Sequence, residues 1–157
     1  MSKIWKSKLR KELKIRFFRS TVEGVLLYGA EGWTLTKELE RRLDGTNTKI
    51  IRAILCITCI ERMTNDELYG DLEKITEVLK VKRLRFIGHM RRRKEELVHQ
   101  LLMWEPKQGK TKGGRPVLSY VDQLRKDMGL NVQQLKTVMD NRDTGKMVVN
   151  DVRTSSN

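Results

Sequence analysis

The 157-residue sequence is poor in proline, cysteine and aromatic residues. Its two prolines are Pro106 and Pro116, so the long segments before and after them lack the strongest helix breaker. Aromatic residues make up 6 % of the chain, and aliphatic side chains must therefore supply most of a core. No apolar run approaches the ~20 residues that a membrane-spanning helix requires, so we expect no membrane partner.

The two cysteines, Cys56 and Cys59, have the C-x2-C spacing of a metal-binding pair. Zinc sites usually repeat such a close pair, but His89 and His99 stand far apart and far from the cysteines. If the helix there includes residues 50–57, Cys56 is a small buried apolar group, and we favour that interpretation. We expect no metal and no cofactor. In a lysine-rich chain this cysteine usage also suggests a reducing compartment, hence an intracellular protein, with the nucleus as the specific candidate.

The acidic residues are scattered, and no Asp-Asp pair occurs in the chain. Polymerases and nucleases that use metal ions need carboxylates clustered around those ions. The stretch YGDL, Tyr69 to Leu72, has one aspartate where the Y-x-D-D signature has two. The chain also lacks a glycine-rich phosphate loop and a G-x-S-x-G motif. We therefore expect no catalytic residue and no enzyme activity for this chain alone.

The apolar residues recur with a period near 3.6, which predicts a mainly α protein, an irregular bundle of about six helices. Gly29 and Gly129 are typical helix ends, and TNDE, Thr64 to Glu67, is a capping box. The expected helical segments are residues 9–27, 36–55, 64–69, 72 or 75 to 93, 95–104, 117–128 and 131–139. The tail VRTSSN is expected to fray.

The expected helices divide the chain into four segments. These are a helical pair over residues 1–60, a helical middle with the basic helix over 61–105, a linker over 106–116 and a small helical end over 117–157. The basic, amphipathic N-terminus also allows a targeting peptide, but its pattern continues into TVEGVLLYG, and we favour a helix of the folded domain. The stretch VLLYGAEGWTLT, Val25 to Thr36, then predicts a packed turn between two helices.

The net charge of +13 is concentrated in three clusters. Residues 3–19 carry eight Lys/Arg and one acid, residues 80–94 carry eight and no acid, and residues 107–116 carry four and no acid. A solvated helix face normally mixes signs, because like charges one turn apart repel. The clusters therefore predict a polyanionic partner, nucleic acid, and a basic face with no ligand is the alternative.

The segment KVKRLRFIGHMRRRK can pack its apolar residues on one face and present Lys82, Arg83, Arg85, Arg92 and Arg93 on the other. The segment KTKGGRP contains the Gly-Arg-Pro core of an AT-hook, but Gly113 stands where the hook has arginine, and we favour a flexible basic linker. The candidate nucleic-acid-binding residues are Lys82, Arg83, Arg85, Arg91, Arg92, Arg93, Lys110, Lys112 and Arg115.

Six motifs follow one another in a familiar order. They are LLYGAEGWTLT, RRL, IIRAILCI, RMTNDELY, RLRFIGHMRR and WEPKQGKTKGGRPVLSYVDQLRKD. From about Lys14 to Val149 the chain resembles the C-terminal, post-palm part of reverse transcriptases of LINE-like (non-LTR) retrotransposons, of the jockey and RTE-like kind. The matching residues are Tyr28, Gly29, Glu31, Trp33, Arg83, Leu84, Arg85, Phe86, Gly88, His89, Gly114, Arg115, Pro116 and Arg142.

The resemblance implies a parent that is an RNA-directed DNA polymerase with an endonuclease. Its catalytic domains would lie upstream, so this chain would be a non-catalytic part that binds the template–product duplex or target DNA and contacts the palm and fingers. Asn141, Gly145 and Lys146 depart from the Asp, Trp and Arg of the family, which predicts weaker packing of the last helix. The alternatives are a degenerate or domesticated fragment that acts as a helical protein-interaction module, or one without function.

Overall fold

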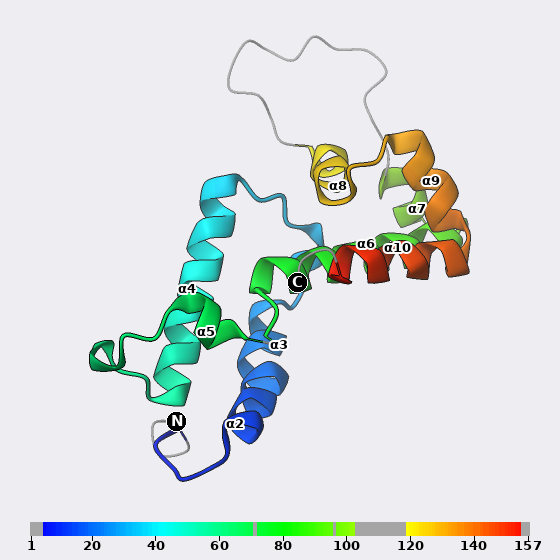
Figure 1. The fold of residues 1–157 in the computed structure, drawn as a ribbon. Helices are drawn as coiled ribbons and strands as arrows, with labels where there is room; N and C mark the ends of the chain where they lie inside the picture. Colours follow the sequence, from blue (N-terminus) through cyan, green and yellow to red (C-terminus); the bar gives the residue numbers. More distant parts are fainter. Residues whose placement is uncertain (1–4, 71, 96, 103–118, 155–157) are drawn as a thin grey trace. The chain divides into compact units, whose positions relative to one another are not determined.

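The computed structural model describes residues 5–70, 72–95, 97–102 and 119–154 (Figure 1). Over these ranges the chain forms helices and no strand, which confirms the mainly α prediction. The helices are α2 (Lys11–Phe18), α3 (Gly24–Leu26), α4 (Lys37–Leu55), α5 (Asn65–Tyr69), α6 (Ile75–Arg92), α7 (Leu97–Leu102), α8 (Tyr120–Met128), α9 (Val132–Asp140) and α10 (Arg142–Thr154). No helix in these ranges is both long enough and apolar enough to cross a membrane.

The chain folds as two units. The first comprises residues 1–30 and 37–79, and the second comprises residues 31–36 and 80–157. Helix α6 contains the boundary, because its residues 75–79 belong to the first unit and its residues 80–92 to the second. The boundaries of these two units differ from the boundaries of the four segments expected from the sequence.

The first unit is built around α4, which packs against α2. Its core contains Phe18, Ile51, Ile54, Leu68 and Tyr69. Polar contacts from the middle of α4 support this core. The Tyr69 hydroxyl lies 2.9 Å from Thr48 Oγ1, and the carboxylate of Asp44 accepts from the backbone N–H and the hydroxyl of Thr76 at 3.2 and 3.0 Å. Asp44 thereby ties the start of α6 to α4.

The first helical stretch differs from the uninterrupted helix expected over residues 9–27. A π-helical turn, Arg19–Glu23, separates α2 from α3. Within it the Thr21 hydroxyl donates to the Phe17 carbonyl at 2.6 Å, and such a side-chain bond competes with regular helical pairing. The stretch ends as predicted, since Gly29 has a φ of +67°, a conformation that glycine adopts without a Cβ penalty.

The predicted capping box is present at α5. Thr64 Oγ1 accepts from the Glu67 backbone N–H at 3.2 Å, and Glu67 Oε2 accepts from the Thr64 N–H at 2.8 Å. These bonds from Thr64 hold the pKa of Glu67 below its usual 4.5. The box therefore satisfies two N–H groups that a helix start leaves without an intrahelical partner.

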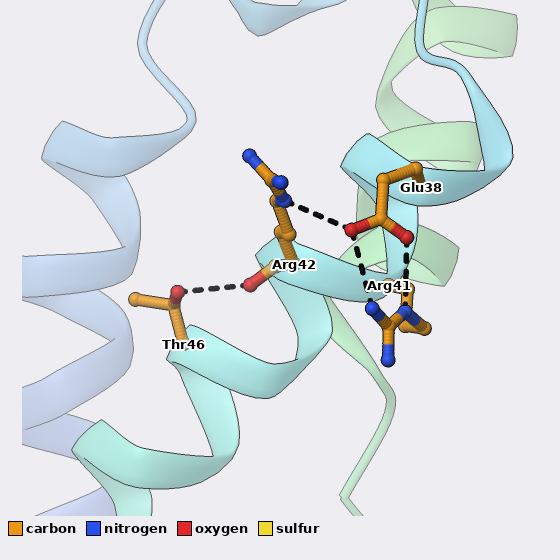
Figure 2. Close-up of polar contacts among 4 residues, drawn as sticks. All are labelled: Glu38, Arg41, Arg42 and Thr46. Atoms are coloured by element: carbon orange, nitrogen blue, oxygen red, sulfur yellow. Dashed lines mark hydrogen bonds and ion pairs between the residues drawn. The ribbon is translucent and has the colours of Figure 1, made fainter.

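Close to the start of α4 the sequence RRL forms a local charge cluster (Figure 2). Glu38 accepts from Arg41 at 3.1 Å and from Arg42 at 2.9 Å, and these two bonds lower the pKa of the Glu38 carboxyl. All three side chains are exposed. Arg41 and Arg42 are thus cations with a carboxylate partner on their own helix.

The second unit has its own core, to which α6, α8, α9 and α10 contribute. Its buried residues are Val81, Leu84, Ile87, Leu124, Leu135, Met139 and Val149. Residues 152–154, which we expected to fray, are helical and form the end of α10. Gly145 is buried against Met139, and α10 packs against α9 without an aromatic residue at position 145.

Candidate nucleic-acid interface

The expectation that Arg83 faces outward is wrong. Its side chain is 1 % exposed and forms an ion pair with Asp127, and its second terminal nitrogen donates to the Trp33 carbonyl at 3.0 Å. Leu79 and Ile87 lie one turn before and after Arg83 and are both buried, so residue 83 falls on the core-facing stripe of α6. Arg83 is therefore a structural residue and leaves the candidate binding set.

A hydrogen-bond network extends from this ion pair to the segment Glu31–Thr36. Asp127 also accepts from the Gln123 amide at 2.9 Å, and the Gln123 carbonyl oxygen accepts from the Leu35 N–H at 3.1 Å. The Tyr120 hydroxyl donates to the Glu31 carbonyl at 3.0 Å, and burial raises the pKa of Tyr120 to about 12. Side chains from α6 and α8 thus hold the backbone of this segment within the second unit.

The packed turn expected over Val25 to Thr36 is packed in part. Leu27 and Ala30 are fully buried, whereas Tyr28 is 88 % exposed and Trp33 is 38 % exposed. Buried and exposed residues alternate here because Gly29, with its positive φ, reverses the chain direction between Leu27 and Ala30. The prediction of a core role is therefore wrong for Tyr28, and Trp33 contributes its carbonyl to the Arg83 network.

A hollow of about 440 Å³ lies between α6 and α10 in the second unit. Its cationic lining is Arg85 and Arg92 from α6 with Arg142 and Lys146 from α10, and His89 adds an imidazole. Its floor is formed by Leu84, Gly88, Met139, Gly145 and Val149. No acidic residue of the described ranges lines it.

The four cations around the hollow lack carboxylate partners among the described residues. They are also exposed. Arg85, His89 and Arg92 occupy positions i, i+4 and i+7 of α6, while Arg142 and Lys146 occupy positions i and i+4 of α10. Helical side chains at these spacings share one face, so two basic stripes border one hollow.

The other predicted residues have different surroundings. Arg91 pairs with Asp140 at 2.8 Å and is 13 % exposed, so much of its charge is compensated. Lys82 is partly buried, and Arg93 is exposed just after α6. Lys110, Lys112 and Arg115, with the whole Gly-Arg-Pro element, lie outside the described residues. Of the predicted set the hollow thus gathers Arg85 and Arg92.

Sequence analysis missed Arg142 and Lys146 as candidate binding residues. Their i,i+4 spacing is the signal that could have found them, since it places two positive charges on one helical face. The signal was hidden because residues 142–154 have mixed charge and a glycine, which obscured the helix. Only the packing of α10 beside α6 joins the two basic stripes.

The expectation that Cys56 is buried is wrong. Helix α4 ends at Leu55, and Cys56 has a φ of +57°, is exposed and points its Sγ toward the Trp5 carbonyl at 3.3 Å. Nothing is described of the side chains of Cys59 and His99. Over the residues that the structure covers, no three His, Cys, Asp or Glu side chains gather as metal ligands.

Comparison with known proteins gives one informative relationship. The chain is 30 % identical over 125 residues to a protein of Caenorhabditis elegans described as transposon-derived and uncharacterized. The aligned part covers 75 % of this chain and 45 % of that protein, so the chain spans less than half the length of this relative. No family model and no solved structure matches. The chain is therefore a distant homologue of a transposon-derived protein.

Proposed function

We propose that this chain is a non-catalytic, nucleic-acid-binding part of an RNA-directed DNA polymerase of a non-LTR retrotransposon. The observation that carries the proposal is the set of four unpaired cations around the hollow between α6 and α10. Arginine matches phosphate geometry with paired N–H donors, and each neutralised phosphate releases counterions. The six ordered motifs and the homology to a transposon-derived protein support a retrotransposon origin.

The ligand in this proposal is the backbone of a template–product duplex or of target DNA. Arg85 and Arg92 extend from α6, and Arg142 and Lys146 from α10, so contact with several phosphates is within reach of one face of the unit. Phosphate contacts of this kind position a protein on nucleic acid without reading its sequence. The proposed role is to hold the nucleic acid while catalysis occurs in other domains.

The first unit supplies the proposed contact with those other domains. Leu13 and Phe17, one turn apart on α2, are 48 % and 39 % exposed, Leu9 before the helix is 47 % exposed, and Val25 and Tyr28 are still more exposed. Exposed apolar side chains gathered in one segment of a charged protein are typical of a surface that another domain or protein covers. In the proposal it faces the palm and fingers that the resemblance implies. It is also the observation that favours the second candidate, a helical protein-interaction module.

The test is fluorescence anisotropy with duplex DNA, single-stranded RNA and an RNA–DNA hybrid across a salt series. The variant Arg85→Glu/Arg92→Glu removes two proposed phosphate contacts. For duplex DNA we expect the slope of log affinity against log salt to become shallower by roughly 1.8, because each contact contributes about 0.9. The matched control is Arg41→Glu/Arg42→Glu, which reverses two arginines that pair with Glu38.

Equal loss of binding in both double variants would mean that net charge alone drives association, and the proposed interface would then be rejected. Absence of salt-dependent binding by the wild-type chain would favour the protein-interaction module instead. A stronger affinity for the hybrid than for duplex DNA would connect the interface to the polymerase reaction.

A further inference from the structure

The hollow has a feature that binding to a phosphate backbone alone does not require. Its floor is apolar and includes two glycines, Gly88 and Gly145, one on each of the two helices that border it. A volume of about 440 Å³ falls in the range of small-molecule pockets, roughly 300–1,000 Å³. A convex basic face would be enough to hold phosphates, so the hollow itself points to a group that enters it.

The lining defines the chemistry of that group. The cations at the rim require a ligand with negative charge, and the lining beneath them is apolar, with Leu84, Met139 and Val149. Unstacked bases of nucleic acids stack on arginine planes and imidazole rings and contact apolar side chains. Arg92 and His89 provide these two kinds of surface at the same rim. A nucleotide combines the anionic and the flat apolar parts in one ligand.

The position of Arg92 supports this arrangement. A methyl group placed on Gly88 would lie 3.2 Å from Arg92 Nη1 and 3.5 Å from Met139 Sδ. The guanidinium thus lies directly over the backbone of α6 at Gly88, with a thioether beside it. Met139 itself is 1 % exposed, so the surface offered here to a flat ring is the exposed guanidinium of Arg92.

We propose that the hollow between α6 and α10 receives one unstacked nucleotide of a nucleic-acid strand, with its base on the apolar floor and its flanking phosphates on the basic rim. This inference rests on the proposed function, because it assigns a ligand to the same surface. It adds a preference: a strand with an unpaired nucleotide binds more tightly than a blunt duplex, whose paired and stacked bases do not reach the floor.

The experiment compares three labelled DNA duplexes by fluorescence anisotropy at one salt concentration. The first is blunt, the second carries a single unpaired nucleotide at a 3′ end, and the third carries the same extension without its base. We expect the wild-type chain to bind the second about tenfold more tightly than the third, as one stacked base contributes. The abasic duplex keeps the phosphate, so this ratio isolates the base from the charge.

The variant Gly145→Leu tests the hollow itself. A Cβ on Gly145 would meet Val138 O at 3.6 Å and Met139 Sδ at 3.7 Å, which are ordinary contacts, so the substitution adds volume while keeping every cation. We expect it to remove the tenfold ratio between the base-containing and the abasic extension. The matched control is Gly45→Leu, a substitution at a glycine of α4 with open space around it, which keeps the ratio.

The outcomes separate this inference from the proposed function. If the wild type binds the blunt duplex with a steep salt dependence but binds the base-containing and abasic extensions equally, the inference is overturned and the interface stands. If it binds no duplex in a salt-dependent way, both fall. Should Gly145→Leu fail to fold, as its circular dichroism would reveal, the wild-type comparison of the two extensions decides the inference by itself.

Discussion

Arg83 and Asp127 form an ion pair in which both side chains are almost completely removed from solvent, at 1 % and 0 % exposure. The pair joins α6 to α8; in addition, Arg83 Nη2 donates to the Trp33 carbonyl and Asp127 Oδ1 accepts from the Gln123 amide. Arg83 Nε is a buried donor without a partner among the described residues. A buried pair of this kind matters for stability chiefly because removal of one member leaves the other as a buried charge without a partner.

We expect Asp127→Ala to destabilise the second unit by roughly 3–5 kcal/mol, because it leaves the Arg83 guanidinium buried and uncompensated. The measurement is the free energy of unfolding in urea, monitored by circular dichroism. The control is Glu38→Ala, which removes the carboxylate of an exposed pair and should leave the free energy of unfolding nearly unchanged. Similar losses in the two variants would contradict the structural role of the Arg83–Asp127 pair.

Stability should fall at alkaline pH through Tyr120. Its pKa is raised by burial from 10.0 to about 12, so the fold favours the neutral hydroxyl, and this contribution is fully present below pH 10. It is lost as the pH rises from about 10 to about 12, because the unfolded chain binds fewer protons than the folded one in that range. The measurement is the urea midpoint between pH 9 and 12.

The variant Tyr120→Phe identifies the residue responsible for that alkaline loss. We expect the variant to lack the hydrogen bond to Glu31 and to show a smaller decline in urea midpoint over this interval than the wild type. Parallel pH profiles for the two proteins would show that Tyr120 does not cause the loss.

The capping box at α5 gives a prediction for the first unit. Thr64→Ala removes the oxygen that accepts from the Glu67 N–H, and we expect a loss of about 1 kcal/mol in the free energy of unfolding. Thr64→Ser keeps a hydroxyl and should retain most of the stability. Because the pKa of Glu67 is lowered, its contribution is present above pH 4.5 and declines as the pH falls below that value. An alanine variant as stable as the serine variant would argue against the cap.

Gly45→Ala should stabilise α4. The glycine occupies the interior of a 19-residue helix, and a Cβ there would meet nothing within 4 Å. Alanine favours the helix by about 1 kcal/mol relative to glycine, so we expect a higher thermal midpoint. The measurement is thermal unfolding followed by circular dichroism, and an unchanged or lower midpoint would contradict the helical, open environment of residue 45.

Local signals predicted most of the fold. The capping box at Thr64, the glycine ends at Gly29 and Gly129 and the apolar period of α6 each depend on residues close in sequence, and each is confirmed. Helix α10 was missed because its mixed charges and Gly145 weaken the local pattern. Its stability comes from burial of Val149 and Gly145, which is a tertiary effect.

The candidate site was less predictable for the same reason. A basic stripe on α6 was visible in the sequence, yet the sequence does not show that Arg83 meets an aspartate 44 residues later or that Arg91 meets one 49 residues later. Both pairings remove charge from the predicted face. Conversely, Arg142 and Lys146 join Arg85 and Arg92 only through packing. Long-range partners therefore decide which arginines remain available.

The network around Asp127 also has a consequence for folding during synthesis. The Leu35 N–H donates to the side-chain oxygen of Gln123, which is 88 residues further along the chain. At about 5–20 residues per second, a ribosome needs roughly 4–18 seconds to make the intervening residues. During that interval the segment Glu31–Thr36 lacks its hydrogen-bond partners Tyr120 and Gln123. The nascent second unit is thus exposed to chaperones and proteases for seconds, while α4, which follows that segment in the sequence, can already form.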